Sequence, residues 1–598
     1  MNPPHRPSDT FPSEPDAGLS EAPTAAAPQQ RGLAGWLLAA RGPEVSLRVL
    51  LAATMLTCAI FLANAFAVPG SAYAIQDDAR QFLAWTARLT DIPALKGDLI
   101  ADYWHSVTPR ALRAFYGVLA MAGIPPLVLA RLIPVALLLA SAFFAFRAAM
   151  VLTRERALAA LVVAATVMAL LVHEDSIFTS TARAFSPPLF LMFLDGLLRD
   201  KRWQVVLALG VLAAVYPTTA LVGLTMLGFA TLRLRQWPPF DTNPRALATV
   251  VIATLAVAAP ILTLPGEVQR WEPVITIADA LTMPNLGTPG GRSSIVPLEG
   301  TYPFLCSARV GILPEIVPCW ATRWATPLNA LLLLPLLILG VGAARRAWRG
   351  EPRSPDIIYF WAVIAGAMWW AVATIFAFKL HLPARYPQRV LSILEWMAIG
   401  QMIGMWLDQR FASEGVSGKV RAAAVTLLAL FVISFASPTP GMRRPMEPQV
   451  MDWLRAAPSA VKVGGLSSDL DFVPAITGRA THVTVEHAIP YHLTYFREID
   501  RRLVATVEAF TSPEGAVLAD FIEAERLDVL LVDRAFIERS DIPDDYAGVV
   551  PAAVAEGEAR LAAAPSALQR KAKACAIIEG EAVWLLDAKC LAARAPAA

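Results

Sequence analysis

A polytopic α-helical membrane protein with about 11 transmembrane helices and a C-terminal α/β domain is the fold class that this sequence predicts. The chain has 598 residues, of which 56% are hydrophobic and 17% are charged, and its mean hydropathy is +0.51. A soluble protein would carry about a quarter charged residues. Several apolar runs also reach the roughly 20 residues that cross a bilayer as a helix. These observations exclude an ordinary soluble protein.

Three regions follow from the changes in composition along the chain. Residues 1–44 predict a disordered cytoplasmic tail, because residues 1–30 are rich in Pro, Ala and Ser and lack the apolar core of a signal peptide. Residues 45–437 predict the transmembrane domain. Its spans are expected at 46–67, 126–151, 157–172, 186–198, 203–215, 217–232, 246–265, 327–344, 357–378, 389–407 and 421–437. A C-terminal α/β domain is expected over 438–598.

Basic residues predict which side of the membrane each loop faces. Clusters such as Arg154 with Arg156, and Arg345 with Arg346, fall in loops that the positive-inside rule places in the cytoplasm. The two short apolar runs 203–215 and 217–232 then each have to cross the membrane, with a turn at Tyr216 between them. This choice puts the N-terminus inside. The large first loop 68–125, the loops 173–185 and 266–326, and the C-terminal domain are expected outside.

Cysteine placement agrees with that sidedness. Cys306 and Cys319 share one outer loop, Cys575 and Cys590 share the C-terminal domain, and Cys58 lies in a span. Two close pairs on the outer side predict two disulfides in an oxidising compartment, with free thiols as the alternative.

The C-terminal region alternates helical and β-rich patterns. Helices are expected over "PQVMDWLRAAP", "YHLTYFREIDRRLVATVEAF" and "EGAVLADFIEAERL". Strands are expected over "AVKVGG", "RATHVTVEHA" and "DVLLVD", and "CAIIEGEAVWLLDAKC" predicts a hairpin whose ends the cysteines tie. The segment "KVGGLSSD" lacks the glycine spacing of a dinucleotide site. His482, His487 and His492 are five residues apart, which is not a helical zinc pattern.

An acidic pair follows the first span. In "AIQDDARQFLAWTARL" apolar residues recur at helical spacing, which predicts a helix lying on the membrane surface with its apolar side down. Asp77 and Asp78 fall in its first turn, where the helix dipole favours negative charge. One interpretation is therefore that they only stabilise the helix start. The other is a carboxylate at the water–lipid boundary that takes a proton from a hydroxyl or holds a divalent cation.

This order of elements resembles the GT-C class of integral-membrane glycosyltransferases, which includes protein O-mannosyltransferases and lipid A aminoarabinose transferases. The resemblance implies a GT-C-like fold, a polyprenyl-phosphate-linked sugar donor and inverting transfer to an extracytoplasmic acceptor (a cell-envelope glycan, lipid or protein). It also implies that Asp77 or Asp78 is the base, with Asp77 slightly preferred. A divalent cation, Mg or Mn, would be held by Asp77, Asp78 and Asp98. This chain has Asp-Asp where relatives have Asp-Glu or Asp-x-Asp.

Further candidates lie in segments that resemble other loops of that class. The segment "LKGDLIADYWHSVTPRALRAFYGVLAMAGIPP" carries Asp98 and Asp102 as a second acidic site, and "HEDS" adds Glu174 and Asp175. Guanidinium and ammonium groups suit a donor phosphate. The candidates for that role, in "STARAFSPPLFLMFLDGLL" and around "LHLPARYPQRV", are Arg183, Lys379, His381, Arg385 and Arg389. The alternative is that these basic residues anchor span ends to lipid headgroups.

Two more features bear on function. The Gly- and Pro-rich outer loop that contains Cys306 and Cys319 is a candidate lid, and Glu395 is an ionisable residue inside a predicted span.

Two other functions compete with glycosyl transfer. One is a transporter or lipid flippase, and the other is a non-catalytic scaffold that displays the outer domain. The expected setting is a bacterial inner membrane, with the C-terminal domain in the periplasm. The bilayer, the donor and the acceptor are the expected partners, and no nucleic acid is expected.

Overall fold

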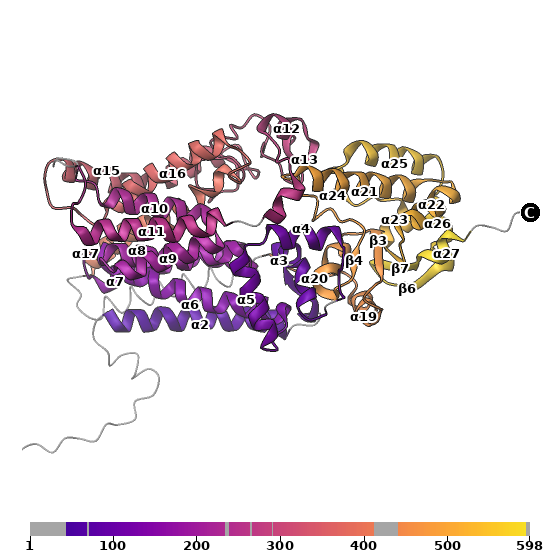
Figure 1. Ribbon diagram of the computed structural model, residues 1–598, viewed down its shortest axis with the longest axis horizontal. Coiled ribbons are helices and arrows are strands. Elements are labelled where there is room, and N and C mark those ends of the chain that lie inside the picture. Colours follow the sequence, from indigo (N-terminus) through magenta and orange to yellow (C-terminus); the bar gives the residue numbers. More distant parts are fainter. Residues whose placement is uncertain are drawn as a thin grey trace, which may run out of the picture. The chain divides into compact units, whose positions relative to one another are not determined.

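The computed structural model describes residues 43–67, 71–91, 93–233, 239–263, 266–289, 291–411 and 441–593. They belong to a compact unit that extends from Gly42 to Ala598, shown in Figure 1. The predicted tail up to residue 42 and the predicted span 421–437 lie outside the described residues.

A bundle of apolar helices forms one part of this unit. The helices are α2 (Pro43–Phe66), α6 (Pro126–Leu152), α7 (Ala157–His173), α8 (Ser186–Leu198), α9 (Arg202–Val215), α10 (Pro217–Ala230), α11 (Pro244–Leu262), α14 (Ala325–Leu332), α15 (Leu334–Trp348), α16 (Ile357–Ile375) and α17 (Gln388–Arg410). Among the described residues, 6 helical segments are long and apolar enough to cross a membrane, and three shorter apolar helices accompany them. The chain is a multi-pass membrane protein, and each predicted span before residue 410 coincides with helix.

Small residues bring the central helices of the bundle together. The helix α7 packs against α6 and α17. A Cβ atom on Gly404 of α17 would lie 2.7 Å from the carbonyl oxygen of Ala159, and one on Gly400 would lie 2.3 Å from Oγ1 of Thr166. Glycine therefore permits the close helix contact that is common between membrane helices. Between α9 and α10 the chain breaks at Tyr216, and Pro217 begins α10, as the sequence predicts.

Short elements connect the bundle to the C-terminal region. The first loop contains η1 (Ser71–Tyr73), β1 (Ile75–Gln76), α3 (Asp77–Phe82), η2 (Ala84–Leu89), α4 (Leu99–Val107) and α5 (Arg110–Met121). Later loops contain η3 (Asp175–Thr179), η4 (Ala182–Phe185), η5 (Gly266–Trp271), α12 (Ile277–Thr282), α13 (Pro284–Gly287) and η6 (Pro383–Arg385). The strand β1 pairs antiparallel with β2 (Met442–Arg443), and Ile75 lies opposite Arg443.

The helix predicted over residues 75–89 is shorter in the structure than the sequence suggests, and its apolar side packs on protein instead of the membrane. The helix α3 ends at Phe82, and η2 continues the chain. Ile75, Ala79, Leu83 and Trp85 belong to a buried core that also contains apolar side chains of the C-terminal region, such as Leu470 and Val473. The prediction that this apolar side faces the membrane is therefore wrong, because protein covers it.

The C-terminal region holds a mixed five-stranded sheet with strand order β4-β3-β5-β7-β6. The strands are β3 (Lys462–Leu466), β4 (Ala480–Thr481), β5 (Val529–Asp533), β6 (Ala576–Glu579) and β7 (Val583–Asp587). Both neighbours of β3 are parallel to it, and β7 is antiparallel to β5 and β6. The helices are α19 (Pro448–Ala456), η8 (Ser468–Phe472), α20 (Val473–Thr477), α21 (Leu493–Thr511), α22 (Gly515–Glu525), α23 (Arg534–Arg539), α24 (Asp544–Ala547), α25 (Pro551–Ala563), α26 (Ala567–Lys571), η9 (Ala572–Cys575) and α27 (Ala588–Ala592).

A strand and two disulfides that the sequence predicts can be compared directly with the structure. The strand expected over "RATHVTVEHA" is limited to Ala480–Thr481, because the chain then leaves the sheet and carries Glu486 to the first loop. Both predicted disulfides are present, Cys306–Cys319 and Cys575–Cys590.

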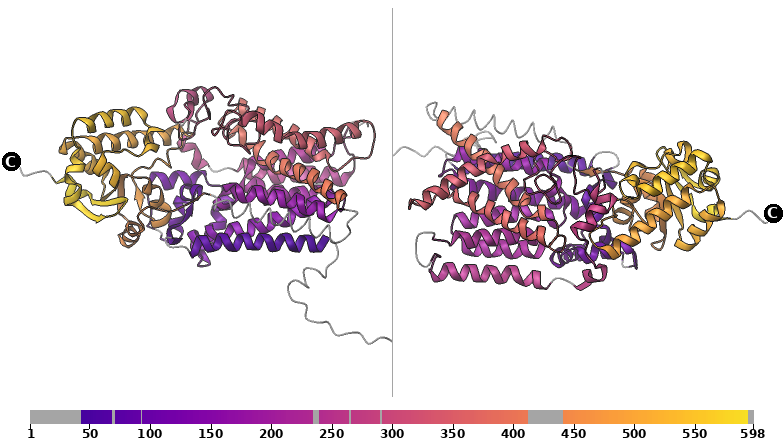
Figure 2. Two further views of the ribbon diagram at one scale, coloured as in Figure 1. Left: turned by 180° about the vertical axis from the view of Figure 1, so that it is seen from behind. Right: turned by 90° about the horizontal axis from the view of Figure 1, so that it is seen from above.

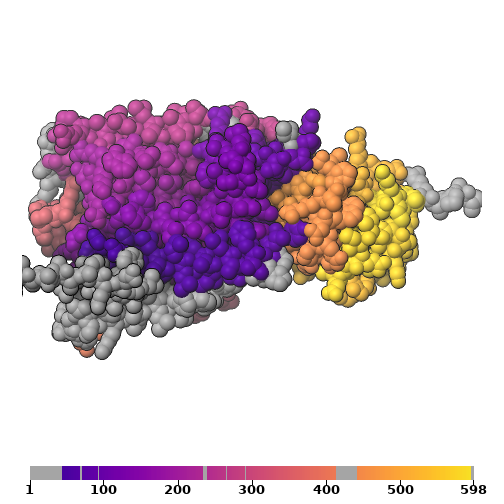
Figure 3. All heavy atoms as spheres, turned by 90° about the horizontal axis from the view of Figure 1, so that it is seen from below, coloured from indigo at the N-terminus to yellow at the C-terminus, as the bar shows by residue number. Residues whose placement is uncertain are grey.

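The C-terminal region lies next to the first loop. Figures 2 and 3 show it in orange and yellow beside the indigo and violet residues of that loop, and α20 packs on η2.

Candidate active site

The acidic pair lies at the start of α3 but does not cap it. The side chain of Gln76 is the N-cap, and it accepts a hydrogen bond from the Ala79 backbone N–H at 3.1 Å. The backbone N–H of Asp77 donates to the Gly441 carbonyl at 2.8 Å. Because the Gln76 side chain accepts from a backbone N–H at the start of the helix, neither Asp77 nor Asp78 is needed as a cap, and both carboxylates are available for other contacts.

Asp77 belongs to an ion-pair network with the C-terminal region. Its Oδ1 lies 2.7 Å from Nη2 of Arg80 and 3.8 Å from Nε of Arg443. The same Arg80 guanidinium lies 3.4 Å from Asp471 and 3.1 Å from Glu486. Asp77 thus helps to hold α3 against the C-terminal region.

Asp78 faces a different group of arginines. Its Oδ2 lies 2.5 Å from Nη2 of Arg183, which η4 carries. Burial raises the pKa of Asp78, but the surrounding guanidinium groups outweigh burial and hold this pKa below its usual range. Those groups belong to Arg183, Arg385, Arg309 and Arg292. The carboxylate of Asp78 is therefore charged and surrounded by cations.

We call Arg183, Arg309, Arg385 and Arg389 the arginine cluster. Arg389, at the start of α17, donates to Oγ of Ser176 at 2.5 Å and lies 3.7 Å from Oε2 of Glu174. The charge of Arg385 interacts with those of the other three members. Among the described residues, neither Arg309 nor Arg385 has a carboxylate at ion-pair distance. Arg309 and Arg385 thus add positive charge that no described carboxylate neutralises by direct contact.

Tyr216 joins this cluster from the break between α9 and α10. Its side chain interacts electrostatically with Arg389, Arg385 and Arg183. The break directs the phenol to this end of the bundle, because Pro217 cannot continue the preceding helix. A phenol hydroxyl adds a neutral hydrogen-bond donor to the arginines.

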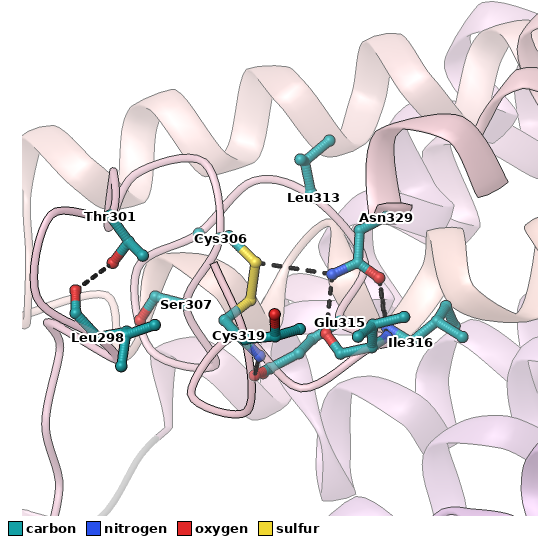
Figure 4. The surroundings of a disulfide bond; sticks show 12 residues. Leu298, Thr301, Cys306, Ser307, Leu313, Glu315, Ile316, Cys319 and Asn329 are labelled. Atoms are coloured by element: carbon teal, nitrogen blue, oxygen red, sulfur yellow. Dashed lines mark hydrogen bonds between the residues drawn. A yellow bond between two sulfur atoms is a disulfide. The ribbon is translucent and has the colours of Figure 1, made fainter. Parts of the chain in front are cut away.

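Arg309 reaches the cluster from the loop closed by the Cys306–Cys319 disulfide. In this loop Glu315 Oε1 accepts from the Cys319 backbone N–H at 2.9 Å (Figure 4). Burial raises the pKa of Glu315, against the opposing effect of Arg385, Arg309 and Arg389. The loop predicted as a lid therefore contributes both a cation and a carboxyl group to the surroundings of the cluster.

The second acidic site predicted in the first loop does not join the cluster. Asp98 is the N-cap of α4, accepting from the Ala101 N–H at 2.7 Å, and burial raises its pKa to about 6. Asp102 forms an ion pair with Arg88 at 2.7 Å. The charged neighbours of Asp98 are Arg502, Arg88 and Asp102, so both residues support the first loop.

The remaining predicted residues lie as follows. Lys379 and His381 are exposed, and the His381 ring has an edge contact with Tyr491 at a centroid distance of 6.5 Å. Asp175 begins η3, and its side chain lies outside the described residues. Glu395 is buried in α17, and neither of its carboxylate oxygens has a hydrogen-bond partner among the described residues.

The predicted metal ligands do not fit a cation in this arrangement. Among the described residues, no three His, Cys, Asp or Glu side chains come together in a way that could hold a metal ion. Asp77 and Asp78 each contact an arginine, and Asp98 caps a helix. The site is better suited to bind an anion than a metal cation.

The sequence interpretation missed Arg309, Tyr216, Glu315 and Arg292. A signal existed for two of them. Arg309 and Glu315 lie between two cysteines that were expected to pair, so the closed loop had to present its polar side chains near its own ends. The sequence placed Tyr216 at a turn between two spans but did not mark its phenol as a site group, and no local pattern distinguishes Arg292.

Neither a protein-family model nor a curated protein sequence matches the chain. Solved structures do resemble it. The Archaeoglobus fulgidus oligosaccharyltransferase AglB, in complex with an inhibitory peptide and a dolichol-phosphate, shares 12% identity over 84% of this chain and 72% of its own, with a TM-score of 0.47. The same archaeal enzyme with Zn and sulfate gives 11% identity over 83% and 70%, with a TM-score of 0.44.

The arabinofuranosyltransferase AftD from Mycobacteria is also similar, with 16% identity and a TM-score of 0.44. The alignment covers 81% of this chain but only 35% of AftD, so the chain spans about a third of that enzyme's length. At these levels of identity, each comparison is a likeness of fold to that solved structure.

Proposed function

We propose that this protein is a membrane glycosyltransferase that moves a sugar from a polyprenyl-phosphate-linked donor to an extracytoplasmic acceptor with inversion. One observation supports this most strongly. The carboxylate of Asp78 contacts Arg183 within an arginine cluster of which two members contact no carboxylate among the described residues. A base and an anion site that meet at the end of a bundle of membrane helices match a reaction on a lipid-linked phosphate.

The arginine cluster is suited to the leaving group. The donor is a phosphodiester with one negative charge, and a second develops on the phosphate as the bond from the sugar to its oxygen breaks. Arg309 and Arg385, which contact no described carboxylate, can stabilise that charge, and guanidinium groups bind phosphate oxygens in a fixed geometry. The surplus positive charge therefore favours the transition state over the bound donor.

We assign the base to Asp78 rather than to Asp77. The acceptor hydroxyl attacks the anomeric carbon, its proton passes to the Asp78 carboxylate, and the polyprenyl phosphate leaves with the electron pair of the broken bond. Asp77 is held by Arg80 in the network with the C-terminal region. When a donor phosphate binds, Arg183 can turn from Asp78 to the phosphate, which raises the pKa of Asp78 and makes it a stronger base.

The domain division and the sidedness belong to the same proposal. Residues 45–437 form the catalytic membrane domain, and residues 438–598 form the outer domain that helps to select the acceptor. The contact of Asp471 and Glu486 with Arg80 supports a role for the outer domain in placing α3.

The test substitutes the two aspartates separately, as Asp78→Asn and Asp77→Asn. Transfer is assayed in proteoliposomes with a panel of polyprenyl-phosphate sugars and envelope acceptors. We expect Asp78→Asn to lower kcat by about 10²- to 10⁴-fold, the usual contribution of a general base. It should still bind polyprenyl phosphate, because the cluster is intact. Full transfer by Asp78→Asn would remove the catalytic assignment, and loss confined to Asp77→Asn would reassign the base.

A transporter is the second candidate, because the buried carboxyl group of Glu395 has no hydrogen-bond partner among the described residues. Such groups in membrane helices mark proton or ion pathways. The variant Glu395→Gln separates the two functions. Sugar transfer should persist in it, whereas a proton-coupled transport activity should be lost.

A further inference from the structure

The loop between Cys306 and Cys319 has an inner face bound to the helix bundle. The side-chain amide of Gln388, at the start of α17, donates to the carbonyls of Ser307 at 3.0 Å and Leu313 at 2.9 Å. Trp370 of α16 donates to the Val310 carbonyl at 2.9 Å, and the Ala384 N–H donates to the Arg309 carbonyl at 3.1 Å. This face therefore holds the backbone of Arg309 beside the arginine cluster.

The loop is fixed from within as well. The disulfide closes it, and the buried side chain of Asn329 accepts from the backbone N–H groups of Ile316 at 3.2 Å and Val317 at 2.8 Å. Asn329 also donates to the Val317 carbonyl at 2.9 Å. Figure 4 shows Asn329 directed at the disulfide and at Ile316. The disulfide and the Asn329 hydrogen bonds hold the loop in one shape, which also fixes the positions of the segments on either side of it.

Large apolar side chains of the two segments that flank the loop remain exposed. We call them the aromatic rim: Tyr302, Phe304, Leu305, Trp320 and Trp324. Tyr302 is 72% exposed, and Trp320 and Trp324 are each 68% exposed. No member of the rim is charged, and the nearby cation, Arg323, is exposed. A patch of this kind marks an interaction site.

The position of the rim identifies its partner. Trp324 directly precedes the candidate span Ala325–Trp348, and Trp370, which binds the loop, lies near the end of the span α16. These two span ends put the loop at the level of the membrane surface. Trp and Tyr are enriched at that level, since their rings suit a boundary that is apolar on one side and wet on the other. Arg323 is placed to contact headgroup phosphates.

We propose that the aromatic rim inserts into the headgroup region of the bilayer, on the side of the membrane that carries the C-terminal region. The Cys306–Cys319 disulfide then ties the two lipid-facing flanks to the base of the loop that positions Arg309. If the proposed function holds, the rim also fixes Arg309 at the depth of a lipid-linked phosphate and borders the route by which the polyprenyl chain enters.

Fluorescence quenching in vesicles tests the insertion without any turnover. Cys58 is buried and is the free cysteine of the chain, since the other four of its five cysteines form the two disulfides. A cysteine introduced as Trp320→Cys or Tyr302→Cys can therefore be labelled with a bimane dye. The full-length variants are reconstituted in phosphatidylcholine–phosphatidylglycerol vesicles. Val517→Cys, on the exposed face of α22, is the matched control.

Lipids with a nitroxide near the headgroup should quench the dyes at 302 and 320 at least twofold more than the dye at 517. Aqueous iodide should show the reverse order. Strong iodide quenching at 302 and 320 without lipid quenching would overturn the proposal and leave a water-exposed or protein-binding surface. A second measurement avoids new thiols, because the Trp320→Phe/Trp324→Phe variant should lose part of the tryptophan quenching by brominated lipids that the unaltered chain shows.

The consequence for the donor is tested separately. Trp320→Ala/Trp324→Ala should raise the KM of a long-chain polyprenyl-phosphate sugar about tenfold and leave the KM of a short-chain, water-soluble analogue unchanged. Equal effects on both donors would contradict a role in presenting the lipid. If no donor supports transfer by the unaltered chain, the proposed function fails while the quenching result still decides on insertion.

Discussion

Nη2 of Arg80 lies 3.1 Å from Oε2 of Glu486, a residue 406 positions further along the chain. The same guanidinium contacts Asp77 and Asp471, and Arg292 contacts Glu486 at 2.7 Å. This network joins the first loop, the long loop after α11 and the C-terminal region next to Asp78. The surroundings of the proposed base are therefore built from three distant parts of the chain.

Loss of Arg80 should destabilise the protein strongly. Arg80→Ala leaves buried carboxylates with one cation fewer, and breaking a buried ion pair from one side costs about 3–5 kcal/mol. We expect a clear fall in the Tm of the purified protein, partly restored in Arg80→Ala/Asp471→Asn because the second change removes a buried charge whose ion-pair partner among the described residues is Arg80. An Arg80→Ala variant as stable as the unaltered chain would contradict the structural role of this network.

Loss of Arg183 should change the pH dependence of transfer. The arginines hold the pKa of Asp78 low, so the carboxylate of the free enzyme is charged even in mildly acidic solution. Arg183→Ala should raise that pKa, and the acidic limb of the kcat/KM profile should then move to higher pH. A lower rate with an unshifted acidic limb would mean that Asp78 is not the base.

Affinity for the lipid phosphate should depend on Arg309 and Arg385. A hydrogen bond to a charged group contributes about 1.5–3 kcal/mol, which corresponds to roughly 10- to 150-fold in Kd. Arg309→Ala and Arg385→Ala should each weaken binding of polyprenyl phosphate by that factor, measured by titration in detergent micelles. The matched control is Arg539→Ala in α23, where the exposed guanidinium contacts Asp541. Equal losses in all three variants would point to a nonspecific charge effect.

Asp98 should make stability fall as pH rises through its titration range. Burial raises its pKa to about 6, above the unfolded value near 4, so folding favours the protonated form. The stability that Asp98 contributes is complete below pH 4 and lost as pH rises through about 6. Asp98→Asn retains the cap oxygen without the charge. Its free energy of unfolding, relative to that of the unaltered chain, should therefore rise by about 2–3 kcal/mol as the pH goes from 4 to 7. A Tm difference that does not change with pH would refute this.

The C-terminal disulfide should stabilise the sheet without touching the site. Cys575 and Cys590 are separated by 15 residues, and closing such a loop stabilises by about 3 kcal/mol in the chain-entropy treatment. Cys575→Ser/Cys590→Ser should lower the Tm and speed proteolysis near β6. Its kcat should stay at the level of the unaltered chain, and a large loss of kcat would imply that β6 and β7 contribute to the acceptor site.

The sequence predicted most of the helices and the two disulfides, because apolar run length, proline position and cysteine spacing are local signals. Apolar periodicity also located α3, but it could not show what covers the helix. The core around Ala79 and Leu83 depends on side chains such as Leu470 and Val473, almost 400 positions away, and no local pattern reports such a contact.

The site was predictable in part for the same reason. Basic residues next to span ends, such as Arg183 and Arg385, can be found from the sequence. The choice between Asp77 and Asp78 cannot, because it depends on the direction of each side chain around α3 and on the position of Arg80. Gln76 as the helix cap was also missed, since serine, threonine, aspartate and asparagine are the usual caps.

The pairing of β1 with β2, where Ile75 lies opposite Arg443, has a consequence for biosynthesis. The ribosome makes residue 443 only after every helix described up to residue 410, so Asp77 lacks its partner Arg443 until then, whereas Asp78 already has Arg183. A chain cut short after residue 411 could insert every helix described before that point and still lack the residues that fix α3. Placement of α3 therefore depends on the last region of the chain, which supplies β2 and the apolar side chains of Leu470 and Val473.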